Sequence, residues 1–263
     1  MNRRLTILLT ALSALLSTTL GAQTKGFSLR VMSMNIRQGG EYAGFLAEPF
    51  AELINLYKPD VIALQEIDYY TDRNGHRDWF NDVAMQTGML PYYCKGANYR
   101  NGAFGLGLLS RYPFYNGGKI VTVLPDNDEA RVSGWIYLML PDGNTLRVAS
   151  THLALATPQQ NVRQLADVNK QLFAADTTTP TLLVGDFNAD PDSDTINYAR
   201  IKWQDIGRGT GFTIPTSGPY SRIDYVMGYP KGCWSYTTYE IVCRADLSDH
   251  CFIVADVEFT PTE

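Results

Sequence analysis

Short apolar segments that end in a polar residue constrain this 263-residue chain most strongly. Val61–Leu64 and Thr181–Val184 are continuously apolar, which is typical of strands that are buried on both faces. Each is preceded by a predicted strand and an amphipathic helix, and each is soon followed by an acid, Glu66 or Asp186. Two halves with this pattern bury their apolar surfaces best in two packed sheets with helices outside, an α/β architecture.

Periodicity extends this pattern over one domain. Helices are predicted from Pro49 to Tyr57, from Asp78 to Thr87, and after the Thr157-Pro158 cap. Further strands are predicted at 29–34, 104–109, 119–124, 131–140, 145–150, 223–227, 236–242 and 252–259.

The first 22 residues have the pattern of a cleaved export signal. Arg3 and Arg4 precede an apolar run from Leu5 to Leu20, and small residues precede Gln23. The run is shorter than the roughly 20 apolar residues of a membrane span. We therefore expect one mature domain at 23–263, no integral membrane segment after cleavage, and a periplasmic or extracellular location.

Export would permit disulfide bonds between the four cysteines, Cys94, Cys233, Cys243 and Cys251. Three pairings are open, and the sequence does not choose among them. A local bridge between Cys233 and Cys243, which flank a predicted strand, is conceivable. The alternative is that they are small buried residues.

A net charge of −5 makes a large basic face for gripping nucleic acid unfavourable. A nucleic acid substrate is therefore not favoured, although a local site could still bind phosphate. We expect a monomer.

Polar side chains gather just beyond the predicted strand ends, where a rigid scaffold places functional groups. They are Asn35, Glu66, His152, Asp186, Asn188, Asp224, Asp249 and His250. Carboxylates, amides and phosphate oxygens suit Mg²⁺, and an imidazole held by a carboxylate can contact a phosphate or move a proton. These residues together predict metal-assisted phosphoryl chemistry.

In this order the motifs resemble those of the endonuclease/exonuclease/phosphatase superfamily. The matching segments are Met34-Asn35-Ile36-Arg37, Leu64-Gln65-Glu66-Ile67-Asp68, Gly107–Pro113, Ser150-Thr151-His152-Leu153, Gly185-Asp186-Phe187-Asn188-Ala189, Arg222-Ile223-Asp224-Tyr225 and Ser248-Asp249-His250. The resemblance covers about Leu29 to Phe259. It implies a four-layer sandwich, two mixed sheets face to face with helices outside.

The resemblance also implies roles. Glu66 corresponds to the principal Mg²⁺ ligand, with Asn35 and Asp249 completing or supporting that site. Mn²⁺ is expected to substitute for Mg²⁺.

The remaining motif residues would handle the phosphate and the water. Asp186 resembles the residue that positions or deprotonates the attacking water, and Asn188 the group that steadies the phosphate. His250, oriented by Asp224, resembles the imidazole at the scissile phosphate, and His152 the imidazole on its other side.

Two departures bear on the substrate. Tyr99-Arg100-Asn101-Gly102 offers no acid where the DNases have a glutamate, so His152 lacks an evident partner. Arg37 stands where abasic-site enzymes carry an acid, and we expect it to contact a substrate phosphate.

The sequence thus predicts an exported, Mg²⁺-dependent phosphoesterase that prefers a small or lipid-derived substrate. A secreted nuclease is the first alternative, and a non-catalytic binding protein that kept the fold is the second. A glycosidase with paired carboxylates would explain neither the two histidines nor Asn35 and Asn188.

Overall fold

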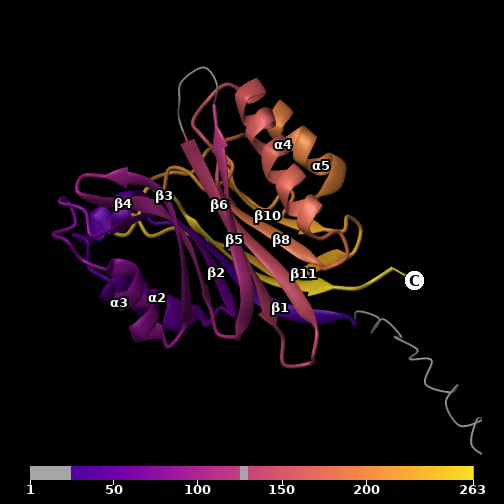
Figure 1. The fold of residues 1–263 in the computed structure, drawn as a ribbon, viewed down its shortest axis with the longest axis horizontal. Coiled ribbons are helices and arrows are strands. Elements are labelled where there is room, and N and C mark those ends of the chain that lie inside the picture. Colours follow the sequence, from indigo (N-terminus) through magenta and orange to yellow (C-terminus); the bar gives the residue numbers. More distant parts are fainter. Residues whose placement is uncertain (1–24, 125–129, 263) are drawn as a thin grey trace, which may run out of the picture.

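The computed structural model describes residues 25–124 and 130–262. The signal segment predicted at 1–22 lies outside the described residues. The strands form two six-stranded mixed sheets. These lie face to face, with helices α2 and α3 outside one sheet and α4 and α5 outside the other (Figure 1). The predicted four-layer α/β sandwich is confirmed.

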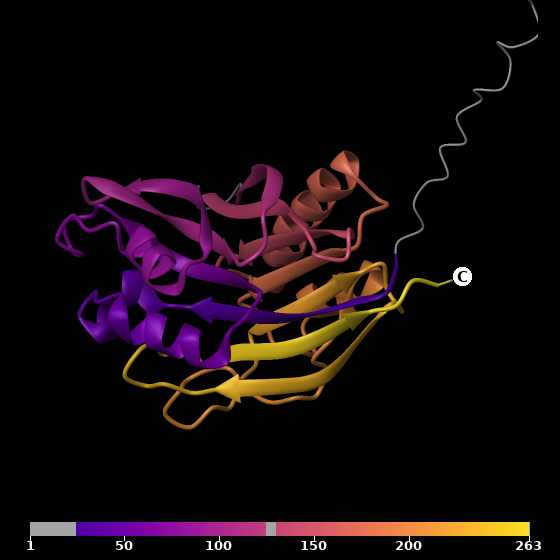
Figure 2. The ribbon, with the colours of Figure 1, turned by 90° about the horizontal axis from the view of Figure 1, so that it is seen from below.

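The first sheet has the strand order β11-β12-β1-β2-β4-β3. Its members are β1 (Phe27–Asn35), β2 (Val61–Tyr69), β3 (Leu90–Tyr99), β4 (Gly102–Ser110), β11 (Trp234–Val242) and β12 (Phe252–Phe259). The first and last strands of the chain pair antiparallel at its centre, so the indigo and yellow ribbons run side by side in Figure 2. β1 and β2 pair in parallel.

The second sheet has the strand order β5-β6-β7-β8-β10-β9. Its members are β5 (Phe114–Val123), β6 (Ala130–Met139), β7 (Thr145–His152), β8 (Thr181–Asp186), β9 (Gln204–Asp205) and β10 (Asp224–Tyr229). The parallel β7–β8 pair repeats the β1–β2 pair of the first sheet.

The helices begin where the sequence provides a capping side chain or a proline in the first turn. α2 (Glu48–Tyr57) has a proline in its first turn, and Asp78 caps α3 (Trp79–Thr87) by accepting from the backbone N–H of Asn81. Thr157 and Gln160 form a capping box at the start of α4 (Pro158–Ala175). Two further elements are α5 (Asp194–Lys202) and a short turn, α1 (Arg37–Gly40), which a 3₁₀ segment at Glu41–Ala43 follows.

Three apolar clusters hold the layers together. One lies between the sheets and includes Val31, Val61, Val148 and Val184. A second joins the first sheet to α2 and α3, and a third joins the second sheet to α4 and α5. Alternate residues of the buried strands therefore serve opposite faces, as a period of two requires. None of the helices within 25–124 and 130–262 has the length and apolar content to cross a bilayer.

The disulfide differs from the local bridge that the sequence made conceivable. Cys243 pairs with Cys251, while Cys94 and Cys233 are buried thiols. Cys233 and Cys243 stand at opposite ends of β11, and an extended strand rises about 3.3 Å per residue, so they are too far apart to bond. The bond that does form joins the end of β11 to the start of β12.

Candidate active site

Strand pairing in the second sheet brings three predicted residues together. In the β7–β8 register His152 lies opposite Asp186, and in the β8–β10 register Asp224 lies opposite Asp186. Asp186 is therefore the central member of a row that crosses three strands at one end of the sandwich. All three side chains are buried, at 9%, 1% and 2% exposure respectively.

The first sheet contributes Asn35 and Glu66 at the same end. Asn35 pairs with Gln65 in the β1–β2 register, directly beside Glu66. The β2–β4 register shifts between Leu64 and Ile67, and Glu66 has a φ of 64°, in the left-handed region. This β-bulge re-aims the glutamate side chain, and backbone strain of this kind is typical of functional positions.

Hydrogen bonds fix the Glu66 carboxylate and link it to Asp186. The amide nitrogen of Asn35 donates to Glu66 Oε1 and to Asp186 Oδ2, at 3.1 Å each. The backbone N–H of Gln38 donates to Glu66 Oε2 at 2.8 Å. Asn35 thereby connects the two sheets at the site.

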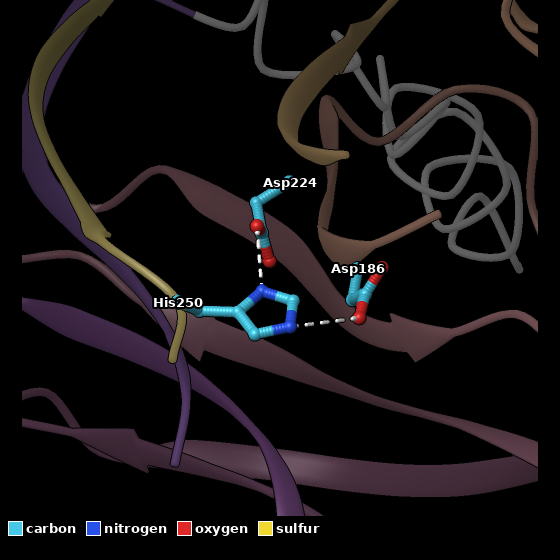
Figure 3. Close-up of side chains that lie close together, drawn as sticks. All are labelled: Asp186, Asp224 and His250. Atoms are coloured by element: carbon cyan, nitrogen blue, oxygen red, sulfur yellow. Dashed lines mark hydrogen bonds and ion pairs between the residues drawn. The ribbon is translucent and has the colours of Figure 1, made fainter. Parts of the chain in front are cut away.

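His250 lies between two carboxylates (Figure 3). Its Nδ1 is 2.9 Å from Asp224 Oδ2, and its Nε2 is 3.8 Å from Asp186 Oδ2. The backbone N–H of His250 donates to Ser248 Oγ, which in turn donates to the carbonyl of Asn35. The loop before β12 is thus tied to the end of β1.

His152 approaches the same carboxylate from another side. Its Nε2 is 3.5 Å from Asp186 Oδ2, and the Arg131 guanidinium lies 3.3 Å and 3.4 Å from its two ring nitrogens. No acid stands near Tyr99 in the sequence to orient this imidazole, and the neighbour in the structure is the cation Arg131 on β6. Arg131 was missed because the sequence predicted its strand but not the register that places it beside His152.

An open cavity of about 480 Å³ exposes these groups. Its lining includes seven of the predicted residues: Arg37, Glu66, His152, Asp186, Asn188, Asp249 and His250. Asp224 stays buried on the Nδ1 side of His250, where it supports the ring. Gln38, Arg73, Tyr99, Phe104, Arg131, Leu155, Ile214 and Ile223 complete the wall.

Two of the predicted residues make contacts that the sequence did not indicate. Asp249 Oδ2 forms an ion pair with Arg37 Nη1 at 3.2 Å, and both side chains are partly exposed. Asn188 donates through its side chain to the carbonyl of Leu153, and its backbone N–H donates to Asp186 Oδ1 at 2.7 Å. Asn188 therefore orients Asp186, leaving Oδ2 to face the imidazoles.

Burial and neighbouring charges shift the pKa values of these groups in different directions. Burial raises the pKa of Asp186, and the nearby Asp224 carboxylate raises it further. Burial opposes charge on His250, but the contacts with Asp224 prevail and raise its pKa to about 10. Burial lowers the pKa of His152 well below its usual value, with Arg131 and His250 acting in the same direction. The site therefore holds one charged and one neutral imidazole around Asp186.

Two sets of groups could hold a metal ion. Ligand atoms of Asp186, Asp224 and His250 lie within 4.8 Å of one another. In that set, however, His250 and Asp224 are already hydrogen-bonded to each other. A hard divalent cation prefers oxygen ligands, and the Glu66 carboxylate lines the cavity beside Asn35 and near Asp186. The oxygen-rich Glu66 side of the cavity fits such a cation better.

Known proteins resemble this chain in sequence and in fold. Nocturnin from Xenopus laevis is 29% identical over 180 residues, which is 62% of this chain and 44% of that protein. The chain thus spans less than half the length of that curated relative. The human Nocturnin catalytic domain with bound sulfate superposes with a TM-score of 0.72 at 20% identity, over 90% of this chain and 97% of that one.

A bacterial structure extends the likeness in fold. An endonuclease/exonuclease/phosphatase from Bacteroides vulgatus has a TM-score of 0.73 at 16% identity, covering 89% of this chain and 99% of that one. The model of the Endonuclease/Exonuclease/phosphatase family matches residues 32–250, a span that includes every site residue described above. The chain belongs to the endonuclease/exonuclease/phosphatase family.

Proposed function

We propose that this protein is an exported, Mg²⁺-dependent phosphoesterase that hydrolyses a small or lipid-derived phosphodiester or phosphomonoester by in-line attack of water. Endonucleases, exonucleases and phosphatases all cleave phosphoester bonds, so family membership supports the reaction class. The observation that carries the proposal is the position of Asp186 Oδ2. It meets the Asn35 amide and both imidazoles in one open cavity.

Asp186 positions and deprotonates the attacking water. Its Oδ1 is held by the backbone N–H of Asn188, which leaves Oδ2 directed toward the imidazoles. Because burial raises the pKa of Asp186, this carboxylate is a stronger base than an exposed aspartate. Asn188 steadies the phosphate beside it from the same cavity wall.

The two imidazoles act on the phosphate from different sides. Asp224 keeps His250 protonated, so its Nε2–H can donate to a phosphate oxygen as negative charge develops there. His152 is neutral and contacts the phosphate as a hydrogen-bonding group, not as a charge. Arg37, at the cavity wall, binds a further substrate oxygen.

Glu66 would hold the metal, with Asn35 and Asp249 completing or supporting the site. When bound, Mg²⁺, or Mn²⁺ in its place, would neutralise charge on the phosphoryl group and stabilise the transition state. The bulge at Glu66 and the hydrogen bonds from Asn35 and Gln38 fix the carboxylate before a cation arrives.

We also propose that residues 1–22 are removed during export to the periplasm or the extracellular space. The disulfide between Cys243 and Cys251 supports this location, because such bonds persist in oxidising compartments. We propose that the mature enzyme is a monomer.

A nuclease that acts on DNA or RNA is the second candidate, since the family includes endonucleases and exonucleases. The net charge of −5 makes strong attraction to a polyanion unfavourable. A binding protein that kept the fold would not need the linked set of Asp186, His250 and Asp224.

The test uses the chain from Gln23 onward, stripped with EDTA and then supplied with Mg²⁺. Hydrolysis of bis-p-nitrophenyl phosphate, p-nitrophenyl phosphate and plasmid DNA is measured for the wild type, Glu66→Gln, and Glu52→Gln as a matched control on the exposed face of α2. We expect Mg²⁺-dependent turnover that falls at least about 100-fold in Glu66→Gln only. Plasmid cleavage faster than ester hydrolysis would favour the nuclease, and metal binding without turnover would favour a binding protein.

A further inference from the structure

A second, smaller cavity opens beside the catalytic cavity. It has a volume of about 190 Å³ and lies where β3 and β4 of the first sheet pack against β6 of the second. Phe104, Arg131 and His152 line both cavities. A group attached to a phosphate at His152 can therefore reach the smaller cavity, which we call the side pocket.

A break in strand pairing and two glycines leave space for the side pocket. The β3–β4 register shifts between Lys95 and Ala97, so Gly96 is the extra residue of a bulge. A Cβ atom at Gly96 would come within 3.1 Å of Phe104 O and of Val132 Cγ1. A Cβ at Gly105 would meet the carbonyl of Cys94 at 2.1 Å, which keeps a side chain out of the pocket wall there.

The wall of the side pocket is mainly apolar, and its polar side chains are restricted to one side. Ala97, Leu106 and Val132 supply aliphatic surface, and Leu106 and Val132 belong to a small buried cluster with Cys94. The polar side chains of the lining are Arg131 and His152, which also face the catalytic cavity. An apolar group in the pocket would thus remain next to a phosphate bound between those two residues.

The volume restricts what the pocket can hold. An apolar protein cavity of about 150 Å³ binds a benzene molecule, so about 190 Å³ accommodates a single ring but not a long acyl chain. Among the described residues, no carboxylate lines the pocket, and Arg131 and His152 stand at its boundary with the catalytic cavity. The contents are therefore expected to be uncharged.

We propose that the side pocket is a specificity subsite for an uncharged, ring-sized apolar group bonded to the phosphate of the substrate. This inference rests on the proposed phosphoesterase function and narrows its substrate class. Among small substrates, it favours phosphoesters of a cyclic or aromatic group over those of a short chain or a charged headgroup. Ala97, Leu106 and Val132 would supply the apolar contacts, and Phe104 would cover the ring.

Binding of two phosphonates tests the subsite separately from catalysis. The mature protein with Mg²⁺ is titrated calorimetrically with phenylphosphonate and with methylphosphonate, which differ only in the group on phosphorus. Burial of a ring should make phenylphosphonate bind about tenfold or more tightly. Their inhibition constants against bis-p-nitrophenyl phosphate should show the same ratio.

Variants test whether the preference for phenylphosphonate arises in the side pocket. Ala97→Phe fills the side pocket from β3 and should reduce the ratio to about one, whereas Ala97→Ser should preserve it. Leu155→Phe adds the same ring to the wall of the catalytic cavity only, and should also preserve it. Ala97 is exposed, so Ala97→Phe is expected to fold, which a thermal melt checks. Val132→Ala enlarges the pocket and should improve binding of 1-naphthylphosphonate severalfold.

Two results would refute the proposal of this subsite. One is equal affinity of the wild type for both phosphonates. The other is a phenyl preference that survives in folded Ala97→Phe. Failure of the proposed function looks different, because it is the absence of turnover of any phosphoester, whichever phosphonate binds better.

Discussion

Removal of the disulfide between Cys243 and Cys251 should destabilise the protein by a predictable amount. The bond spans a sequence separation of 8 residues, and the loop that it closes carries Asp249 and His250. Without the bond, the unfolded chain regains the freedom of this loop. The perturbation is the double variant Cys243→Ala/Cys251→Ala, or reduction of the wild type.

The loop length sets the magnitude. The chain-entropy relation for a loop of this size gives about 2.5 kcal/mol of lost stability at 25 °C. For a domain of this length, that loss lowers the melting temperature by about 5–10 °C. The folded loop keeps other contacts, since the backbone N–H of Cys251 donates to Thr213 O and that of Thr216 to Asp249 O. Activity well below the melting temperature should therefore fall less than stability does.

The assay is denaturant-induced unfolding of the chain from Gln23 onward, followed by circular dichroism with and without a phosphine reductant. The wild type should lose about 2.5 kcal/mol on reduction. The double variant should start from the lower value and not respond to the reductant. Cys94 and Cys233 are thiols in both proteins, so they cannot account for the difference. A wild type whose unfolding is unchanged by complete reduction would refute the reasoning.

Three further changes test the site. Asp224→Asn should reduce kcat, though less than the roughly 10²–10⁴-fold expected for His250→Ala, and should move the alkaline limb of the kcat profile to lower pH. Asp224 raises the pKa of His250 to about 10, whereas burial lowers it and remains in the variant, so the pKa of His250 should fall. An unmoved limb would show that His250 is not the group that titrates there. Gly185→Ala should cost at least about 2 kcal/mol of unfolding free energy, because the residue has a φ of 137° and its Cβ would meet Thr151 O at 2.2 Å, and a melting temperature equal to the wild type would contradict this. Arg37→Ala should raise KM about tenfold with a smaller change in kcat, and the reverse pattern would place Arg37 at the reacting phosphate.

Much of the fold could be predicted from local patterns. The strands and helices with clear periodicity were found, and the family fold was confirmed. β3 was missed because it contains Pro91 and Gly96 and exposes much of its length, so neither alternation nor a continuous apolar run marks it. α5 was missed because its sequence, Asp194–Lys202, is mostly polar and follows a run of aspartates.

The motif residues were predicted in the same way. Each lies at an end of a predicted strand, where a rigid scaffold places functional groups, so local sequence already indicated that they would gather. The contacts that these residues make could not be predicted from local sequence. Arg131 and His152 lie on neighbouring strands whose exact register the sequence did not predict, and Arg37 and Asp249 lie far apart in the chain, so neither contact had a local signal.

By itself, the sequence determined the strand and helix types, the family and the residues available for chemistry, because period, caps and motif order are local properties of the chain. The tertiary structure alone decided that Asp186 stands at the centre of those residues, since this depends on the pairing of β8 with β7 and β10. It likewise decided the disulfide partner and the side pocket, which depend on distances between segments and on a register shift. Long-range packing fixes such distances, and no local pattern in the chain encodes them.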